Sequence, residues 1–213
     1  MGERRIDFKL YLITDRKLFP DNDSFLSALE AALKGGVSAL QLREKDLPAG
    51  ELLAMAYRIR RLASKYSAKF FVNDRIDVAL CSGADGVHLG QAGIPVCAAR
   101  KTAGDLLLVG VSTHSLREAR LAEEERADFI TFGPLYRTPS KLKFGSPVGL
   151  AGLKKVTEQI SIPVFGIGGI GHDAVNAVMK CGADGVAVIR GILGGADART
   201  AAEQYINILG NRQ

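Results

Sequence analysis

The chain has 213 residues, of which 47% are hydrophobic and 24% are charged, and this composition is typical of one globular domain with a large core. No apolar run approaches the roughly 20 residues that a membrane-spanning helix needs. Lysine and arginine outnumber aspartate and glutamate by 28 to 23, which gives a net charge of +5. The basic residues are spread along the chain and form no run with interleaved aromatic residues. We therefore expect small anionic partners, with no nucleic acid and no membrane.

The three cysteines, Cys81, Cys97 and Cys181, are widely separated and lack C-x-x-C spacing, so the sequence indicates neither a disulfide framework nor a structural zinc site. Residues 1–5 lead into strand-like sequence without the apolar stretch of a secretory signal. We expect a cytoplasmic protein. Whether it forms a homo-oligomer is left open by the sequence.

Short apolar runs predict eight strands, and helical patterns lie between them, most clearly at residues 25–33, 52–63 and 201–209. Ser115 and Glu118 form a capping box at the start of the fifth helix. Strands that alternate with helices predict a parallel sheet, and eight repeats predict closure into a (β/α)8 TIM barrel, an α/β fold, as a single domain over residues 1–213. The predicted strands are Leu10–Thr14, Ala39–Arg43, Lys69–Asn73, Gly86–Leu89, Leu107–Ser112, Phe129–Phe132, Pro163–Ile167 and Gly185–Ile189.

A short segment recurs before several of these strands. Gly83–Val87 returns as Gly182–Val186, with weaker versions at residues 35–37 and 126–129. Each copy is expected to form a helix-to-strand turn in which glycine adopts a left-handed conformation. The alternative fold is a doubly wound open sheet. It is disfavoured because the glycine-rich segment at residues 166–169 comes late in the chain, where barrels bind phosphate.

Polar residues gather at the end of the second predicted strand. Gln41, Arg43 and Lys45 are spaced by two, so on a strand their side chains point to one side. Two cations on that side predict a phosphate or pyrophosphate ligand, because an isolated buried charge is costly. The alternative is that both cations pair locally with Glu44 and Asp46 on a solvated loop.

Asn73 and Asp74 follow the third predicted strand. Oxygen ligands at that position suit Mg²⁺, which takes one or two carboxylates together with substrate phosphate oxygens. Asp74 is therefore the candidate metal ligand. An equally weighted alternative is that Asp74 caps the helix that begins near Arg75.

Later segments complete the predicted site. The backbone N–H groups of Gly168 and Gly169 suit a phosphate, and Ile189 with Arg190 adds to this cradle from the eighth strand; the alternative is a simple glycine-rich turn. The loop at residues 133–141 carries hydroxyls and a cation suited to an anion, although such loops are often only mobile. Its candidate residues are Thr138, Ser140 and Lys141.

Two residues after the fifth strand, Ser112 and His114, are further candidates for ligand contact. His114 suits proton transfer because the charge of imidazole changes near neutral pH, with a solvated loop histidine as the alternative. His88 is predicted to be a packed strand residue, and His172 a residue at the surface start of a helix.

Seven segments in chain order closely resemble the thiamine phosphate synthase and thiazole tautomerase family, and the resemblance runs from about Leu10 to Ile192. The family synthases join hydroxymethylpyrimidine pyrophosphate to thiazole phosphate and release pyrophosphate. The resemblance implies a Mg²⁺-dependent transferase in which loss of pyrophosphate gives a pyrimidine-methyl cation that the thiazole nitrogen captures. The segments are Tyr11–Asp15, Gln41–Lys45, Val72–Asp74, Val87–Gln91, Gly110–Ser112, Gly133–Lys141 and Gly166–Ile170.

When the family's functional residues are matched to positions of this sequence, the resemblance implies three groups of contacts. Asp74 binds Mg²⁺. The pyrimidine pyrophosphate is held by Gln41, Arg43, Lys45, Asn73 and Lys141. The thiazole phosphate is held by Thr138, Ser140, Gly169, Ile189 and Arg190. The candidate catalytic residues are Arg43, Lys45, Lys141, Ser112 and His114.

The chain also departs from the family pattern. Synthases commonly carry an acidic pair after His-Leu-Gly-Gln, whose second member is a metal ligand, but here Ala92 and Gly93 occupy these positions. Arg190 stands where serine is usual. Two alternatives follow: a metal-independent thiazole tautomerase that uses His114, or a noncatalytic barrel that binds thiazole or thiamine phosphate. Asp74 and Gln91 favour the synthase, and the second cationic cluster argues against a simple monophosphate binder.

Overall fold

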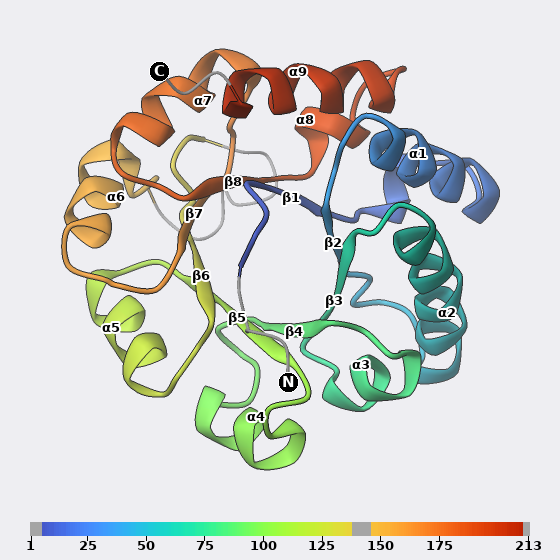
Figure 1. Cartoon of the computed structure of the whole chain (residues 1–213), viewed down its shortest axis with the longest axis horizontal. Coiled ribbons are helices and arrows are strands. Elements are labelled where there is room, and N and C mark those ends of the chain that lie inside the picture. The colour runs from blue at the N-terminus through green and yellow to red at the C-terminus, as the bar shows by residue number, and fades with distance from the viewer. Residues whose placement is uncertain (1–5, 138–145, 211–213) are drawn as a thin grey trace.

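Eight parallel strands close into a barrel in the computed structural model, which describes residues 6–137 and 146–210 (Figure 1). Each strand pairs with the next one in the chain, and β8 pairs with β1. The predicted TIM barrel is confirmed and the doubly wound alternative is wrong. Each predicted strand end lies within one residue of the observed end. The strands are β1 Leu10–Ile13, β2 Ala39–Leu42, β3 Lys69–Asn73, β4 Gly86–Leu89, β5 Leu108–Thr113, β6 Phe129–Phe132, β7 Val164–Ile167 and β8 Gly185–Val188.

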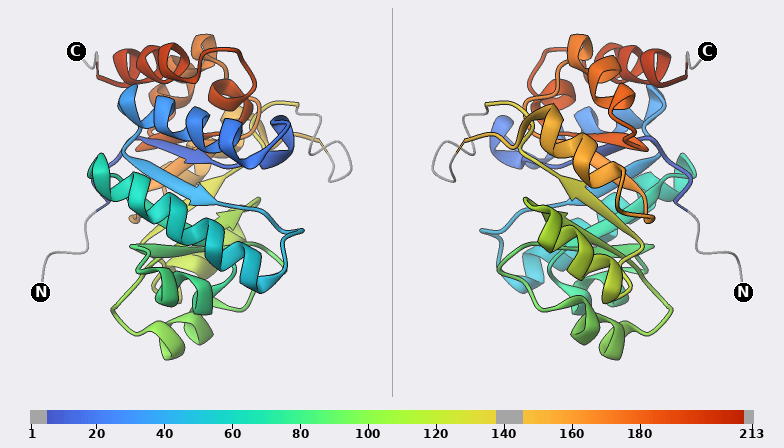
Figure 2. Two further views of the ribbon diagram at one scale, coloured as in Figure 1. Left: turned by 90° about the vertical axis from the view of Figure 1, so that its right-hand side faces the viewer. Right: turned by 90° about the vertical axis from the view of Figure 1, so that its left-hand side faces the viewer.

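Helices surround the barrel on its outside, and α9 lies beside α7, α8 and α1 (Figures 1 and 2). The serine half of the predicted capping box is present, because the Ser115 hydroxyl accepts the N–H of Glu118 at 3.2 Å, whereas the Glu118 carboxylate accepts the N–H of His114 instead of that of Ser115. Among the described residues, no helix is long and apolar enough to cross a membrane. The helices are α1 Asn22–Lys34, α2 Ala49–Lys65, α3 Ile76–Ser82, α4 Val96–Ala103, α5 Leu116–Glu124, α6 Gly149–Thr157, α7 His172–Lys180, α8 Arg190–Leu193 and α9 Ala198–Gly210, with a 3₁₀ turn at Arg16–Leu18.

The barrel wall separates two apolar cores, because successive side chains on a strand point to opposite faces. The outer core fills the space between strands and helices. The inner core is aromatic, with ring centroids 5.1 to 6.4 Å apart. On β3 and β6 the next inward-facing residue after the aromatic one is polar, so the aromatic layer forms the floor of the site. Its rings belong to Phe8, Tyr11, Phe71, Phe129 and Phe165.

The recurring turn segment has a specific structural role at the opposite end of the barrel. Gly83 and Gly182 have φ angles of +64° and +87°, which confirms the predicted left-handed turn. In the three copies that contain an aspartate, this residue donates its N–H to the carbonyl of a residue on a preceding strand and accepts that residue's N–H on its carboxylate. These pairs are Asp85 with Phe70, Asp128 with Val109, and Asp184 with Val164.

Asp128 is the best placed of these aspartates for a test of stability. Its carboxylate also forms an ion pair with Arg100, and the two side chains are only 14% and 12% exposed. Asp128→Ala should lower the free energy of unfolding by about 3 kcal/mol, because Arg100 and the Val109 N–H both lose a buried acceptor. Urea unfolding would measure the change.

The matched control is Asp23→Ala. Asp23 also pairs with an arginine, Arg58, but its side chain is 88% exposed. An exposed pair contributes less than about 1 kcal/mol. Equal losses in the two variants would contradict the proposed role of the recurring aspartate.

Candidate active site

The carboxyl-terminal ends of all eight strands meet at one end of the barrel, which we call the carboxyl-terminal face (Figure 2). Gln41 lies near the end of β2, is 1% exposed, and donates its Nε2–H to the Tyr11 hydroxyl at 3.0 Å. Burial raises the pKa of Tyr11 well above its ordinary value, so this hydroxyl stays protonated. Gln41 therefore joins the aromatic floor to the polar layer of this face.

The two predicted cations lie just beyond the end of β2. Lys45 Nζ is 3.2 Å from Asp74 Oδ2, and this ion pair joins the loop after β2 to the loop after β3. Within the described part of the chain, the Arg43 guanidinium has no ion pair with a carboxylate. Glu44 and Asp46 instead bind the loop that follows β1. Local pairing of the two cations with Glu44 and Asp46 is therefore wrong.

Asp74 is held in place by several donors. Its Oδ1 accepts the N–H of Gly90 at 2.7 Å, and its Oδ2 accepts Asn73 Nδ2–H at 2.8 Å as well as Lys45. Burial opposes ionisation, but the Gly90 hydrogen bond and the Lys45 charge hold the pKa of Asp74 below its ordinary value. The N-cap position of α3 is Arg75 and has no side-chain hydrogen bond, so the capping alternative for Asp74 is wrong.

The backbone at Asp74 is strained, which fits a residue placed for function. Its φ is +57°, and the Arg75 N–H bonds to the Asn73 carbonyl across it at 2.7 Å. A non-glycine residue in this region costs energy and persists only where its surroundings fix it. The bonds from Gly90 and Lys45 supply that constraint.

The residues around Asp74 fit one Mg²⁺ ion held jointly with a ligand. The carboxylate is ionised and partly exposed, with a side-chain exposure of 27%. Among the residues that the structure describes, no group of three or more His, Cys, Asp or Glu side chains forms a metal centre. A Cβ added at Gly93 would lie 2.8 Å from Asp74 Oδ1, so position 93 adjoins the carboxylate. One carboxylate plus phosphate oxygens and water suits Mg²⁺.

His88 lies beneath Ser112 and is 2% exposed, which confirms the predicted packed strand residue. Its Nε2 is 3.1 Å from Ser112 Oγ and 3.5 Å from Thr131 Oγ1. Burial lowers the pKa of His88 from 6.5 to about 3; Asp74 opposes this shift and Arg43 adds to it. The imidazole is therefore neutral, and it orients the Ser112 hydroxyl.

Sequence reasoning missed the contact of His88 with Ser112 and the presence of Thr131 beside them. The available signal was strand alternation: residue 88 lies on the same side of β4 as Gly86, and Thr131 lies on the same side of β6 as Phe129. A Cβ at position 110 would lie 2.6 Å from His88 Nδ1, so a glycine is needed there.

His114 and Gln91 connect neighbouring loops of the face. The Gly133 carbonyl accepts a hydrogen bond from His114 Nδ1–H, and since a carbonyl only accepts, the lone pair of a neutral His114 ring is on Nε2. Gln91 donates its Nε2–H to the Ser112 carbonyl at 2.6 Å. Both side chains therefore lie among the predicted site residues.

The glycine-rich segment follows β7, as predicted, and Gly168 and Gly169 have φ angles of +97° and +70°. Side chains other than glycine rarely adopt these angles. The Tyr136 N–H donates to the Gly168 carbonyl at 3.0 Å, which fastens the loop after β6 to this segment. Arg190 is exposed and follows Ile189 at the end of β8. The predicted residues Thr138, Ser140 and Lys141 lie outside the described residues.

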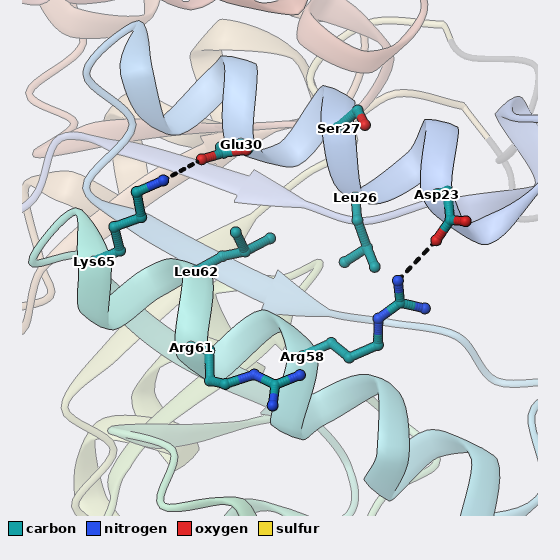
Figure 3. A pocket seen from close by; sticks show the side chains of 8 residues that line it. All are labelled: Asp23, Leu26, Ser27, Glu30, Arg58, Arg61, Leu62 and Lys65. Atoms are coloured by element: carbon teal, nitrogen blue, oxygen red, sulfur yellow. Dashed lines mark hydrogen bonds and ion pairs between the residues drawn. The ribbon is translucent and has the colours of Figure 1, made fainter.

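A groove on the outer wall of the barrel, between α1 and α2, does not share these properties (Figure 3). Its charged side chains pair with each other across the groove: Arg58 with Asp23 at 2.8 Å, and Lys65 with Glu30 at 2.7 Å. The groove therefore contains an ion-paired helix contact, and the candidate active site is at the carboxyl-terminal face.

Known proteins share both the sequence and the fold. The family model described as thiamine monophosphate synthase matches residues 10–192. The thiamine-phosphate synthase of Moorella thermoacetica is 44% identical over 200 residues, which cover 94% of this chain and 95% of that protein. That of Clostridium novyi is 41% identical over 203 residues, which cover 95% and 99%.

Solved structures agree with the sequence comparisons. A thiamine phosphate pyrophosphorylase from Pyrococcus furiosus matches with a TM-score of 0.86 and 40% identity, covering 95% of both chains. A 3-hexulose-6-phosphate synthase matches with a TM-score of 0.70 at 23% identity and shares the fold alone.

The buried neutral histidine predicts a specific acid sensitivity. Between pH 6.5 and about 3 the unfolded chain binds a proton at His88 that the folded protein does not. The stability that neutral His88 provides is therefore present above pH 6.5 and is lost as the pH falls, by up to about 1.4 kcal/mol per pH unit. His88→Gln should flatten this slope in urea unfolding between pH 6.5 and 4.

His172→Gln is the matched control, because His172 bonds only to the Ala201 carbonyl in the described structure and is partly exposed. An equal change of slope in both variants would show that the effect is not specific to His88. An unchanged slope in His88→Gln would show that His88 does not carry this acid sensitivity.

Proposed function

Because the chain belongs to the thiamine monophosphate synthase family, we propose that it couples hydroxymethylpyrimidine pyrophosphate to thiazole phosphate, releasing pyrophosphate and forming thiamine phosphate. In this role the chain is a transferase that acts on small phosphorylated substrates. The observation that supports the proposal most strongly is the cluster of Arg43, Lys45 and Asp74 at the carboxyl-terminal face. Two cations beside a single ionised carboxylate leave positive charge available for an anionic ligand.

Arg43 and Lys45 bind the pyrophosphate of the pyrimidine substrate in this proposal. Lys45 is already paired with Asp74, whereas Arg43 has no ion-paired carboxylate among the described residues. When the bond to the pyrimidine methylene breaks, negative charge grows on the departing pyrophosphate. Fixed cations at that point stabilise the transition state more than the ground state.

Asp74 is the proposed ligand of Mg²⁺, with Asn73 as its polar neighbour. When bound, the metal would neutralise charge on the leaving pyrophosphate. The hydrogen bonds from Gly90 and Asn73 keep the carboxylate in one orientation. The carboxylate of Asp74 therefore keeps its place, and only Lys45, which shares Oδ2, has to move for that oxygen to reach the ion.

We place the pyrimidine ring over Gln41 and Ser112. Both side chains are held from below, Gln41 through Tyr11 and Ser112 through His88. A carbocation forms on the pyrimidine when pyrophosphate leaves, and a neutral His88 adds no repelling charge beneath it. This explains why a buried histidine with a low pKa suits this position.

The thiazole phosphate is assigned to the other side of the face. Backbone N–H groups near Gly168 and Gly169, together with Ile189 and Arg190, offer donors and one cation after β7 and β8. From their residue types and the family resemblance, Thr138 and Ser140 remain candidates for the thiazole phosphate, and Lys141 remains a candidate for the pyrophosphate. His114 remains a candidate for proton transfer through its Nε2 lone pair.

The direct test is formation of thiamine phosphate by purified protein supplied with both substrates, with Mg²⁺ varied from none to several millimolar. We expect product only when Mg²⁺ is present, because a single carboxylate and two cations leave part of the pyrophosphate charge uncompensated. Absence of product at every Mg²⁺ concentration, with isomerisation of a thiazole carboxylate phosphate, would instead identify a tautomerase that uses His114.

Position 93 gives a separate test of the metal site. A carboxylate there would adjoin Asp74, so Gly93→Asp should bind Mn²⁺, used as a spectroscopic probe for Mg²⁺, about tenfold more tightly in the absence of substrate. Electron paramagnetic resonance measures this affinity without turnover.

Gly93→Ala is the matched control because its Cβ makes the same close contact with Asp74 Oδ1 but brings no carboxylate. It should not tighten Mn²⁺ binding. Equal affinities of the two variants for Mn²⁺ would argue against a metal ion beside Asp74.

A further inference from the structure

We propose that Glu44 and Thr14 are positioning residues that act together on Arg43 and fix it at the end of β2 for pyrophosphate binding. The proposal rests on the function proposed above for this face. Neither side chain reaches the face itself, since Thr14 is 0% and Glu44 5% exposed. Their effect passes to the ligand through Arg43.

The contacts form a chain with a fixed direction. Glu44 Oε1 accepts the Thr14 hydroxyl at 2.6 Å, and Thr14 Oγ1 accepts the N–H of Arg43 at 2.9 Å. A hydroxyl has one proton, and Thr14 gives it to Glu44, so the lone pairs of Oγ1 are directed to Arg43. Without Glu44 the hydroxyl can rotate and donate elsewhere.

The position of Arg43 makes this bond important. β2 ends at Leu42, and the last backbone bond between β1 and β2 runs from the Thr14 N–H to the Gln41 carbonyl at 2.9 Å. In a parallel ladder of this register the next bond would join the Arg43 N–H to the main-chain carbonyl of Thr14. The Thr14 hydroxyl takes that place. The backbone from which the Arg43 side chain projects is therefore fixed by a side chain.

Glu44 also joins the loop after β1 to the loop after β2. Its Oε1 accepts the Arg16 N–H at 3.0 Å, and its Oε2 lies 3.9 Å from Arg16 Nε. The Arg16 guanidinium bonds more closely to Asp46, at 2.6 Å. The buried carboxylate thus lacks a close ion pair of its own.

Such a group is costly for stability. Burial raises the pKa of Glu44, so the folded protein holds the proton more tightly than the unfolded chain, and stability falls as the pH rises above the ordinary glutamate range. Ionisation of the Glu44 carboxyl is therefore less favourable in the folded protein than in the unfolded chain. A residue that stabilises the fold poorly but organises Arg43 fits a positioning role better than a purely structural one.

The hydroxyl link is tested by Thr14→Val, which keeps the shape, with Thr14→Ser as the matched control that keeps the hydroxyl. Calorimetric titration with inorganic pyrophosphate, with and without Mg²⁺, measures binding without turnover. We expect Thr14→Val to weaken pyrophosphate binding about tenfold and Thr14→Ser to change it by less than about threefold. The KM for the pyrimidine pyrophosphate should rise in parallel, and the KM for thiazole phosphate should not change.

The carboxylate is tested by Glu44→Ala and Glu44→Gln. Gln can retain both hydrogen bonds of Oε1, so it should preserve pyrophosphate affinity without loss of melting temperature, whereas Ala should match Thr14→Val. The double variant Thr14→Val/Glu44→Ala should bind no more weakly than either single variant, because both remove the same link.

The possible results are distinct. Additive losses in the double variant, or equal increases in the KM of both substrates together with lower melting temperatures, would show that the pair only supports the fold. If the wild type forms no thiamine phosphate but the Thr14 and Glu44 variants change pyrophosphate affinity as expected, the proposed function is overturned and the positioning role stands. Wild-type activity with normal pyrophosphate binding by Thr14→Val would overturn the positioning role alone.

Discussion

Closure of the parallel sheet is the constraint on which the rest of the molecule depends. Once β8 pairs with β1, every second side chain must lie inside a narrow barrel. Aromatic rings around Tyr11 and Phe129 fill that interior, which removes any channel through it. Polar groups on the same side of each strand can then lie only where the aromatic layer ends. The site is at the carboxyl-terminal face because the interior elsewhere is occupied.

Neighbouring loops of this face are tied together by hydrogen bonds in sequence around the barrel. Each tie joins the end of one strand to the end of the next, so displacement of one loop is resisted by its neighbours. The ties from β1 to β7 are Thr14 to Glu44, Lys45 to Asp74, Gly90 to Asp74, Gln91 to Ser112, His114 to Gly133, and Leu135 to Ile167. The arrangement holds polar groups in fixed positions before any ligand binds, which is the requirement for electrostatic stabilisation of a transition state.

The fold could be predicted from the sequence because its signals are local. Short apolar runs mark buried parallel strands, and the repeated turn at Gly83 and Gly182 marks the return of each helix to the sheet. Much of the candidate site was also predictable, since Gln41 lies near the end of a strand and Arg43 and Asp74 directly follow strands. Strand order turns such positions into neighbours in space.

The remaining features depend on contacts between distant segments. Asp74 could be either a cap or a ligand in the sequence; in the structure Arg75 is the N-cap of α3, and the Asp74 carboxylate bonds to Gly90 and Lys45 instead. Glu44 looked like a local partner for the adjacent cations, yet its carboxylate turns toward the loop after β1. Side-chain direction beyond the end of a strand no longer follows the period of two, so alternation cannot predict it.

The ion pair between Lys45 and Asp74 bears on how this face could bind a ligand with two or more negative charges. Without ligand, the lysine and the carboxylate largely neutralise each other, and the face keeps the positive charge of Arg43. A pyrophosphate group offers Lys45 a second, more highly charged partner. In the proposed function the lysine would turn to the pyrophosphate, and Asp74 would then be available to a metal ion that the same pyrophosphate also attracts. Binding of the anion and of the metal would then be linked through one ion pair, so each would strengthen the other.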